Sequence, residues 1–215
     1  MTTIKWTEYG DSACFCECVD AATASGFAAH IRGSVLPGVT DCWAAFQLVA
    51  VAFDPRWFDL KLLNSLSIPD RMVASGRAHE IPVCYSMGED LNAVCKQVGV
   101  SVAEFISAHV SVEYSVLAIG FAPGFAYLGP VAKPIAGVRR LPAPRQKVQP
   151  GSVAITEVYT AVYPSATPGG WHIVGRTPLC LVDESEGYFG ISAGDRIRFV
   201  EIPKHDFEGL KGRRL

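Results

Sequence analysis

The order of hydrophobic and polar positions changes character near residue 80. Residues 13–19 alternate and are rich in small apolar side chains, a pattern typical of a strand. Asp20 follows directly and suits the N-cap of a helix over residues 21–31, with Gly33 just past the helix end. The start of the chain therefore predicts a strand followed by a capped helix.

A second strand and a second helix are expected before residue 80. Residues 44–53 form a continuous apolar run, which predicts one buried strand. Asp54-Pro55 predicts a helix start, because Asp caps helices and Pro fits the first helical position. Residues 70–80 are polar and contain glycine, as is typical of a linker, and His79 within them is expected at the surface.

After residue 80, two helical segments give way to many short strands. The first helix is indicated by apolar residues at positions i, i+3, i+4 and i+7, namely Leu91, Val94, Cys95 and Val98. The second is indicated by a capping box formed by Ser101 and Glu104. Short β-type runs with Gly and Pro turns follow, at residues 81–85, 115–120, 152–163, 172–177, 179–182 and 196–202. Such a series predicts a sandwich or barrel, and the basic tail 204–215 is expected to fray. We expect an α+β chain with a small N-terminal α/β domain over 1–80 and a β domain over 81–215.

The composition excludes several classes of function. A net charge of −2 gives no electrostatic case for a nucleic-acid partner or an anionic membrane surface. No apolar run reaches the roughly 18–20 residues that a membrane-spanning helix needs. The first residues also lack the apolar core of a signal peptide, so we expect a cytoplasmic protein.

The seven cysteines show no paired spacing, which argues against a disulfide framework. Cys14, Cys16 and Cys18 alternate, so a strand would place all three on one face. Thiolates there could bind a soft metal, but no Cys-x-x-Cys pair or matching histidines accompany them. We therefore expect a buried strand face and no metal site.

The stretch from residue 120 to 176 is the best candidate for a functional site, because Gly and Pro recur there with aromatics and arginines between them. Its first segment can wall a pocket, with the residues Gly120, Phe121, Pro123, Gly124, Phe125 and Tyr127. A hydrophobic plug of a barrel end is the alternative. Nucleotide binding is disfavoured, since Pro123 interrupts the consecutive N–H groups that a phosphate loop needs.

Two arginines and one histidine are candidates for contact with a substrate. Arg145 and Arg176 follow Pro- or Gly-containing segments, and rigidly held guanidinium groups suit bidentate contact with a carboxylate. A structural ion pair is the alternative for each. His109 closes a predicted helix, where it can act as a general base or be a cation at the helix C-terminus.

The ordered motifs resemble one known family over nearly the whole chain. They are Tyr9-Gly-Asp, Phe53-Asp-Pro, His109-Val-Ser-Val-Glu-Tyr, Gly120-Phe-Ala-Pro-Gly-Phe-Ala-Tyr-Leu, Pro144-Arg, Pro150-Gly-Ser-Val, Pro168-Gly-Gly-Trp-His-Ile-Val-Gly-Arg-Thr-Pro and Ala193-Gly-Asp-Arg. The family is that of the B subunit of 5-oxoprolinase, also called the kinase A inhibitor (KipI) or allophanate hydrolase subunit 1 family. It corresponds to the first half of the carboxyltransferase domain of urea amidolyase.

The resemblance implies a fold, a partner and a reaction. The fold is a small α/β domain followed by a cyclophilin-like β-barrel. The partner is a sister chain of the allophanate hydrolase subunit 2 type, also called the C subunit of 5-oxoprolinase. The A subunit of 5-oxoprolinase is a possible third chain. The complex uses ATP to open 5-oxoproline to glutamate, while no cofactor and no metal is expected on this chain. His109 and Arg145 would then be catalytic, and the 120–127 loop, Tyr159 and Arg176 would contact the substrate.

The sequence departs from the family pattern at residues 156–164. Members usually read Ala-Gly-x-Gln-Thr-Gly-Ile-Tyr-Pro there, and this chain has Glu157, Tyr159 and Ala161 at the Gly, Gln and second Gly positions. A phenol does not offer the donor and acceptor set of an amide, so a different lactam or acid, or no turnover, is an alternative. Two further alternatives are a non-catalytic inhibitor of a histidine kinase and half of a urea- or biotin-linked carboxyltransferase.

Overall fold

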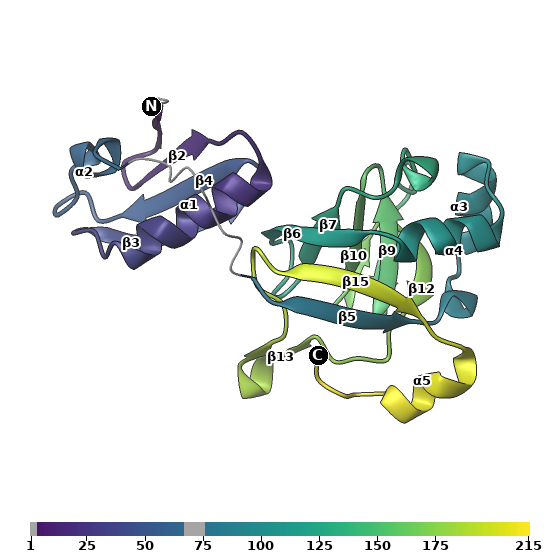
Figure 1. Ribbon diagram of the computed structural model, residues 1–215. Coiled ribbons are helices and arrows are strands. Elements are labelled where there is room, and N and C mark those ends of the chain that lie inside the picture. Colours follow the sequence, from purple (N-terminus) through teal and green to yellow (C-terminus); the bar gives the residue numbers. More distant parts are fainter. Residues whose placement is uncertain (1–3, 67–75) are drawn as a thin grey trace. The chain divides into compact units, whose positions relative to one another are not determined.

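The computed structural model describes residues 4–66 and 76–215. The chain divides into two compact units, Met1–Ser75 and Gly76–Leu215 (Figure 1). Residues 67–75, which include residues 70–75 of the predicted linker, lie outside the described residues. Each unit is described by itself.

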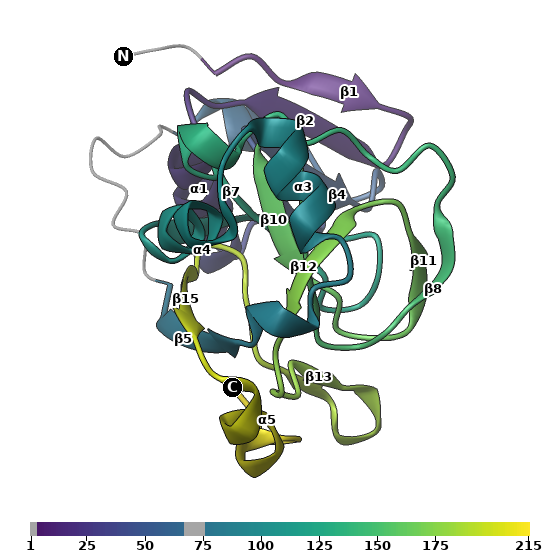
Figure 2. The same cartoon turned by 90° about the vertical axis from the view of Figure 1, so that its right-hand side faces the viewer.

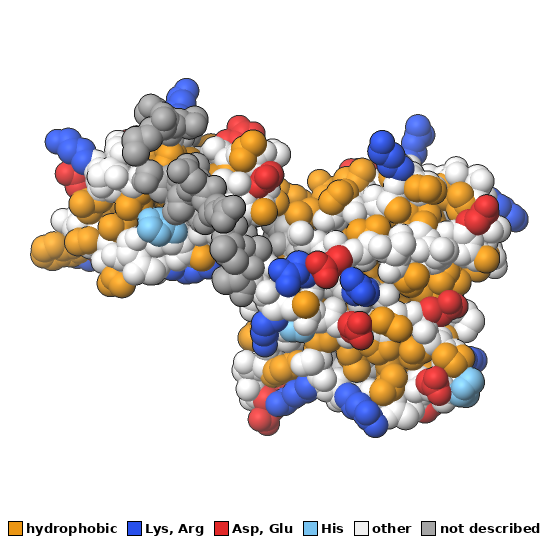
Figure 3. Space-filling model, viewed as in Figure 1, with side chains coloured by type: hydrophobic (Ala, Val, Ile, Leu, Met, Phe, Trp, Pro, Cys, Tyr) orange, Lys and Arg blue, Asp and Glu red, His pale blue; other side chains and the backbone are white. Residues whose placement is uncertain are grey.

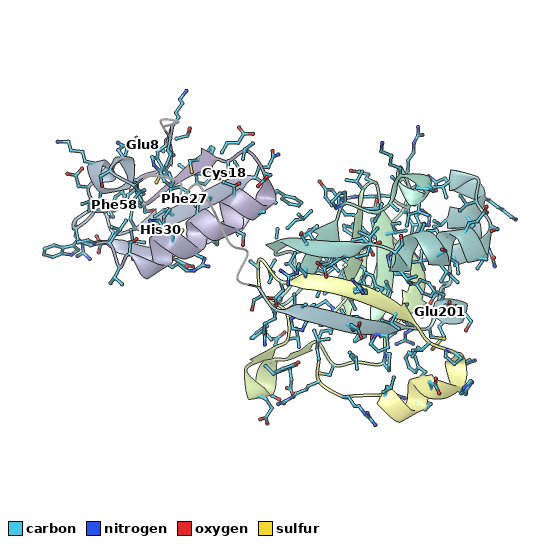
Figure 4. All side chains as sticks on the ribbon, in the orientation of Figure 1. Glu8, Cys18, Phe27, His30, Phe58 and Glu201 are labelled. Atoms are coloured by element: carbon cyan, nitrogen blue, oxygen red, sulfur yellow. The ribbon has the colours of Figure 1, made fainter. Side chains whose placement is uncertain are left out.

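The first unit is an antiparallel sheet with one long helix packed on it. The strands run in the order β1-β2-β4-β3, with the bounds β1 Thr7–Tyr9, β2 Ala13–Glu17, β3 Val39–Ala45 and β4 Leu48–Phe53. Helix α1, Ala21–Gly33, begins as predicted at Asp20, whose Oδ1 accepts the Thr23 N–H at 2.7 Å. Phe27 on α1 lies between the helix and the sheet (Figure 4). A short helix, α2 (Leu60–Asn64), completes the unit.

Cysteines form much of this core. Cys14 and Cys16 are buried on one face of β2, as predicted, and Cys18, just past the end of the strand, is buried in the same core with Cys42 of β3. Burial raises the pKa of Cys16 and of Cys42 to about 12, so these thiols are protonated at neutral pH.

Two predictions for the first unit are wrong. The apolar run 44–53 is not one strand, because the chain reverses at Phe46 (φ +55°) and pairs β3 with β4. Asp54 does not cap a helix but accepts the Arg56 N–H and pairs with its guanidinium at 2.6 Å. The cap of α2 is Asp59 instead, which accepts from the Lys61 N–H.

The second unit is a nearly closed barrel (Figures 1 and 2). Its sheet runs β12-β9-β10-β7-β6-β15-β5, with the bounds β5 Ala78–Val83, β6 Glu113–Ile119, β7 Ala126–Gly129, β9 Ser152–Thr156, β10 Tyr159–Val162, β12 His172–Arg176 and β15 Arg196–Glu201. Cys84 and Arg176 exchange two backbone hydrogen bonds, which join the two edge strands β5 and β12. Because the edge strands β5 and β12 are joined in this way, the sheet closes into a barrel.

Helices and two small ribbons cover the barrel. The helices are α3 Leu91–Val98, α4 Val102–Val110 and α5 Lys204–Leu210, with the 3₁₀ turns Tyr85–Met87, Lys133–Ile135 and Glu184–Glu186. The ribbons are β8 Arg145–Val148 with β11 Thr167–Gly169, and β13 Val182–Asp183 with β14 Tyr188–Phe189. Helices α3 and α4 lie at one end of the barrel, and β8 and β11 lie on the side away from β5 and β15 (Figure 2).

Some of the secondary structure predicted from the sequence for the second unit is observed and some is not. The predicted capping box is present, with the Ser101 hydroxyl accepting the Glu104 N–H and the Glu104 carboxylate accepting the Ser101 N–H. The predicted frayed tail is wrong, because residues 204–210 form α5 and bury Phe207. The run 152–163 is a hairpin rather than one strand.

His79 is a largely buried strand residue. Residues 78–80 belong to β5 rather than to a linker, and β5 pairs in parallel with β15. The His79 side chain is 11% exposed, and its Nε2 lies 2.9 Å from Asp195 Oδ2. Its partner Asp195 is itself buried and accepts the N–H groups of Arg77 and Ser192. The predicted surface position of His79 is therefore wrong.

Apolar side chains pack on both faces of the barrel wall. The inner core takes residues from all seven strands and from α3 and α4. A second, outer cluster covers β7, β9, β10 and β12 and contains the buried residues Phe125, Val148, Tyr163, Ile173 and Trp171. Among the described residues, no helix is long and apolar enough to cross a membrane.

Candidate functional site

His109 lies in the inner core of the barrel with no exposed surface. Its Nδ1 is 2.7 Å from the Tyr85 hydroxyl and its Nε2 is 3.0 Å from the Thr160 hydroxyl. Burial lowers the His109 pKa to about 3, so the ring is neutral at physiological pH. Phe199 stacks on the ring with centroids 4.6 Å apart.

The hydrogen bonds of Thr160 fix the tautomer of His109. The Thr160 hydroxyl donates to the Ala154 carbonyl at 3.0 Å, so it accepts from the His109 Nε2–H. Nδ1 therefore accepts from the Tyr85 hydroxyl, whose pKa is raised by burial and which keeps its proton. Both ring nitrogens are occupied, and a catalytic role for His109 stays a prediction.

Arg145 begins β8, whose Val148 packs in the outer cluster, whereas His109 is fully buried in the barrel interior. Thr160, which contacts His109, is flanked on β10 by Tyr159 and Ala161, and both of these pack in the outer cluster. Successive side chains of a strand point to opposite faces, so His109 contacts the inner face of β10. Within residues 4–66 and 76–215, His109 and Arg145 share no hydrogen-bond partner, and the two predicted catalytic residues are not brought together.

Arg145 forms an ion pair with Asp90. Its Nη2 lies 2.7 Å and 2.8 Å from the two carboxylate oxygens, and the side chains are 26% and 15% exposed. Asp90 also accepts the Ile173 N–H at 2.7 Å, which ties the pair to β12. The structural alternative for Arg145 is therefore realised, yet its Nη1 is buried and has no partner among the described residues.

Asp90, Arg145 and His172 form a polar cluster that contains a second buried atom without a hydrogen-bond partner among the described residues. Nδ1 of His172 is buried without a hydrogen-bond partner among the described residues and lies 4.0 Å from Asp90 Oδ2, while its Nε2 is 3.0 Å from the Arg139 carbonyl. Sequence reasoning missed both Asp90 and His172. Asp90 precedes a helix and resembles a cap, but its side chain makes no cap bond and contacts Arg145 instead.

The loop between β6 and β7 carries residues 120–125 and packs aromatic rings against the outer cluster, while its role as the wall of a substrate pocket stays a prediction. Phe125 is buried and packs edge-on against Tyr163 and Trp171, with centroids 5.2 Å and 5.8 Å away. Phe121 is 61% exposed, with φ at +73°, a conformation that is strained for a residue with a side chain. Gly124 has φ +70° and a Cβ there would collide with Val182, so glycine is required.

The other predicted loop residues take ordinary surface positions. Gly120 has open space around its Cα, so no close backbone approach is needed there, and Pro123 is exposed. Tyr127 is half-buried and its ring lies 5.1 Å from that of Phe125. The loop is therefore an aromatic wall with one exposed ring, Phe121.

The hairpin between β9 and β10 holds the residues that depart from the family pattern. Glu157 has φ +49°, so a residue with a side chain occupies a position where the pattern expects glycine. Tyr159 is half-buried and packs against the outer aromatic cluster. A substrate contact by Tyr159 stays a prediction.

Arg176 lines a pocket of about 420 Å³. The pocket is bounded by the β8–β9 turn, the β10–β11 loop, the segment after β12, and α5, with Tyr163 and Val182 among its lining residues. Tyr163 also contacts Phe121 and Phe125, so the aromatic loop and the pocket adjoin through Tyr163. Within the described residues, no group of three or more His, Cys, Asp or Glu residues could hold a metal ion.

The chain matches known proteins along most of its length. Residues 4–188 match the family described as carboxyltransferase domain, subdomain C and D. The 5-oxoprolinase B subunit of Bacillus subtilis (strain 168) is 36% identical over 203 residues, which cover 86% of this chain and 84% of that protein.

Solved structures show the same fold. The crystal structure of TTHA0988 superposes with a TM-score of 0.77 at 31% identity, over 88% of this chain but only 40% of that longer chain. The K. lactis urea amidolyase, at 14% identity, matches 96% of this chain and 15% of its own with a TM-score of 0.64, which shows the fold alone.

Proposed function

The chain belongs to the carboxyltransferase-domain family, subdomain C and D, together with the B subunit of 5-oxoprolinase, and from this we propose that it is the B subunit of a cytoplasmic, ATP-dependent 5-oxoprolinase. The complex opens 5-oxoproline, or a closely related lactam, to glutamate. The single observation that carries the proposal is the match to the Bacillus subtilis protein over 86% of this chain and 84% of that protein.

The outer face of the barrel supplies the groups that such a reaction needs. Hydrolysis breaks the lactam C–N bond and leaves a carboxylate, so negative charge develops on the carbonyl oxygen. In the proposal, the Arg145 guanidinium, whose side chain is 26% exposed, donates to this oxygen, and Asp90 holds the guanidinium in place. In the proposal, the aromatic loop and Tyr159, which pack in the outer cluster, border the substrate.

His109 acts in this proposal as a positioning residue. Its bonds to Tyr85 and Thr160 join α4 to the inner face of β10, directly behind Tyr159. Both ring nitrogens are hydrogen-bonded to Tyr85 and Thr160, so in this proposal His109 orients β10 and exchanges no proton with the substrate. The reactive water and the ATP are supplied elsewhere in the complex, and this chain binds no cofactor in the proposal.

The exposed ring of Phe121 supports a partner chain on the same face. Backbone strain at an exposed aromatic is retained where the surrounding structure or a function requires it. The partner in the proposal is a sister chain of the type of the C subunit of 5-oxoprolinase, and the A subunit of that enzyme completes the complex. A longer chain such as TTHA0988, of which this chain matches 40%, is consistent with a site shared with a further polypeptide segment.

A non-catalytic inhibitor of a histidine kinase is the second candidate. The departures at Glu157 and Tyr159 favour it, because they alter the donor and acceptor set beside the aromatic loop. Capture of a histidine kinase by the purified chain, with loss of autophosphorylation, would support this alternative over the enzyme.

Steady-state assay of the co-expressed complex tests the proposal. We expect ATP-dependent glutamate release from 5-oxoproline, and a drop in kcat/KM of about tenfold or more for Arg145→Lys, which cannot reproduce the planar guanidinium. Arg198→Gln is the matched control, since Arg198 is exposed and its strand, β15, lies on the side of the barrel away from β8 (Figure 2). A pure, assembled complex that releases no glutamate would reject the proposal.

A further inference from the structure

Two exposed aromatic rings border the same tight loop. Phe121 and Phe189 are 61% and 47% exposed. Phe121 lies on the β6–β7 loop, which is closed by a hydrogen bond from the Gly120 N–H to the Phe125 carbonyl at 3.1 Å. Phe189 ends the β13–β14 ribbon and lies beside Gly124 of that loop, where a Cβ would stand 3.5 Å from the Phe189 ring. The two rings therefore belong to one surface, the Phe121–Phe189 surface.

The loop and the ribbon hold each other in place. Val182 of β13 fills the space that a side chain at Gly124 would need, and Val182 pairs in register with Phe189. The buried ring of Phe125 meets the Phe121 ring edge-on, with centroids 5.3 Å apart. Rings that are fixed in this way lose little conformational freedom when a partner covers them.

The two rings together indicate a binding surface. A single exposed hydrophobic residue is ordinary on a protein surface, whereas neighbouring ones mark interaction sites. Phe121 is also held at a φ of +73°, which is unfavourable for an aromatic residue and keeps it on this loop at a cost. Phe side chains supply large apolar areas to protein interfaces.

The turn of the ribbon adds negative charge beside the rings. Glu184 and Glu186 lie on the 3₁₀ turn between β13 and β14, and both are exposed. The nearby guanidinium of Arg214 is already paired with Asp183 at 3.2 Å and lies over the Tyr188 ring. Hydrophobic and acidic side chains both appear over β13 at the lower end of the second unit (Figure 3). Charge complementarity therefore calls for a partner with basic residues around an apolar recess.

The last residues of the chain are fixed against the same ribbon (Figure 1). The Tyr188 hydroxyl donates to the Leu215 carbonyl at 3.0 Å, and the Cys180 N–H donates to the Arg213 carbonyl at 2.8 Å. Polypeptide joined after Leu215 would thus leave from beside the Phe121–Phe189 surface. TTHA0988, of which this chain matches 40%, has further polypeptide beyond the shared fold. The surface is therefore close to where a continued chain would begin.

We propose that Phe121, Phe189 and the acidic turn Glu184–Glu186 form the docking surface for the sister chain of the C-subunit type. This inference rests on the proposed function for the identity of the partner, and it assigns the surface that the partner covers. The partner places an apolar recess over the two rings and Lys or Arg residues against the acidic turn. Docking there also covers the aromatic loop that borders the substrate in the proposed function.

Calorimetric titration of the full chain with the purified C-type subunit tests the surface. We expect Phe121→Ser and Phe189→Ser each to weaken association by about tenfold or more. Trp57→Ser is the matched control, because it removes a 72% exposed aromatic from the first unit, and its affinity should equal that of wild type. Unchanged affinity of the Phe121→Ser/Phe189→Ser double variant, an equal loss for Trp57→Ser, or no association of the wild-type chain would overturn the inference.

Charge reversal tests the acidic turn separately from the rings. Glu184→Lys/Glu186→Lys should weaken association, and the affinity of wild type should fall more steeply with added salt than that of this variant. Light scattering of the chain alone tests a second copy as the occupant. A dimer of this chain that Phe189→Ser dissociates would assign the surface to self-association and overturn the proposal.

Kinetics of the assembled complex separate this inference from the proposed function. Phe189→Ser should require about tenfold or more chain for half-maximal glutamate release, with an unchanged kcat at saturation, because Phe189 acts in assembly alone. Release at the wild-type concentration of chain would overturn the surface while the proposed function stands. An assembled wild-type complex without release would reject the proposed function, and the titration would still decide whether the two rings bind the C-type subunit.

Discussion

Cys84 and Arg176 exchange backbone hydrogen bonds of 2.8 Å and 3.1 Å, and these two bonds join the edges of the seven-stranded sheet. The contribution of Arg176 to barrel closure therefore comes from its backbone. Its side chain lines the adjacent pocket and is available for another role.

This separation predicts that Arg176→Gln folds with little loss of stability. The substitution removes one side-chain hydrogen bond to the Pro150 carbonyl, worth about 1 kcal/mol, and leaves both backbone bonds in place. Urea unfolding followed by circular dichroism measures the change. A loss of more than about 3 kcal/mol would show that the guanidinium is a structural group.

The buried His109 predicts a specific pH dependence of stability. Its folded pKa of about 3 lies below the ordinary value of 6.5, so between these values only the unfolded state binds the proton. The neutral ring stabilises the folded state fully above pH 6.5. As the pH falls from 6.5 toward 3, the free energy of unfolding decreases by roughly 1.4 kcal/mol per pH unit.

The non-titrating variant His109→Asn isolates this effect. It should be less stable than wild type by about 2–4 kcal/mol at pH 7, because Tyr85 and Thr160 lose their partner. The difference in free energy of unfolding between wild type and His109→Asn should become smaller when unfolding is repeated at pH 6, 5 and 4. Parallel stability curves for the two proteins would contradict a neutral His109 in the folded state.

The Asp90–Arg145 pair predicts strong coupling between the two side chains. Arg145→Ala and Asp90→Ala should each cost about 2 kcal/mol, since each strands a partly buried charge, and the double variant should cost less than their sum. A double-mutant cycle of urea unfolding measures the coupling. Additive losses would mean that the two side chains are not energetically coupled, which would contradict the ion pair.

The backbone of Glu157 predicts a stabilising substitution. Its φ of +49° is unfavourable for a residue with a Cβ, so Glu157→Gly should raise the free energy of unfolding by about 1 kcal/mol. Glu157→Ala removes the carboxylate but keeps the Cβ, and it serves as the control. If alanine stabilises as much as glycine, the charge rather than the backbone is responsible.

Predictions from local sequence succeeded where the signal was itself local. Asp20 and the Ser101–Glu104 pair cap helices by contacts within four residues, so a pattern of that length is sufficient. The series of short strands likewise indicated a sandwich or a barrel, and the structure has the barrel. The apolar run 44–53 failed as one strand because its turn contains Phe46 rather than Gly, Asn or Asp.

Predictions that depended on distant contacts could not be made from one sequence. His109 is surrounded by Tyr85, Thr160 and Phe199, which lie 24, 51 and 90 positions away in the sequence. The face of the barrel wall that each site residue occupies follows from strand pairing, which separates His109 from Arg145. Only the three-dimensional arrangement shows that Asp90 holds Arg145.

Reconstitution of the complete enzyme tests the central claim most directly. Partner subunits of the A and C types are assembled with and without this chain, and glutamate is measured after addition of 5-oxoproline and ATP. The account predicts ATP-dependent glutamate release that requires this chain and disappears when it is omitted. Equal release without the chain, or none from the fully assembled complex, would contradict its assignment as the B subunit.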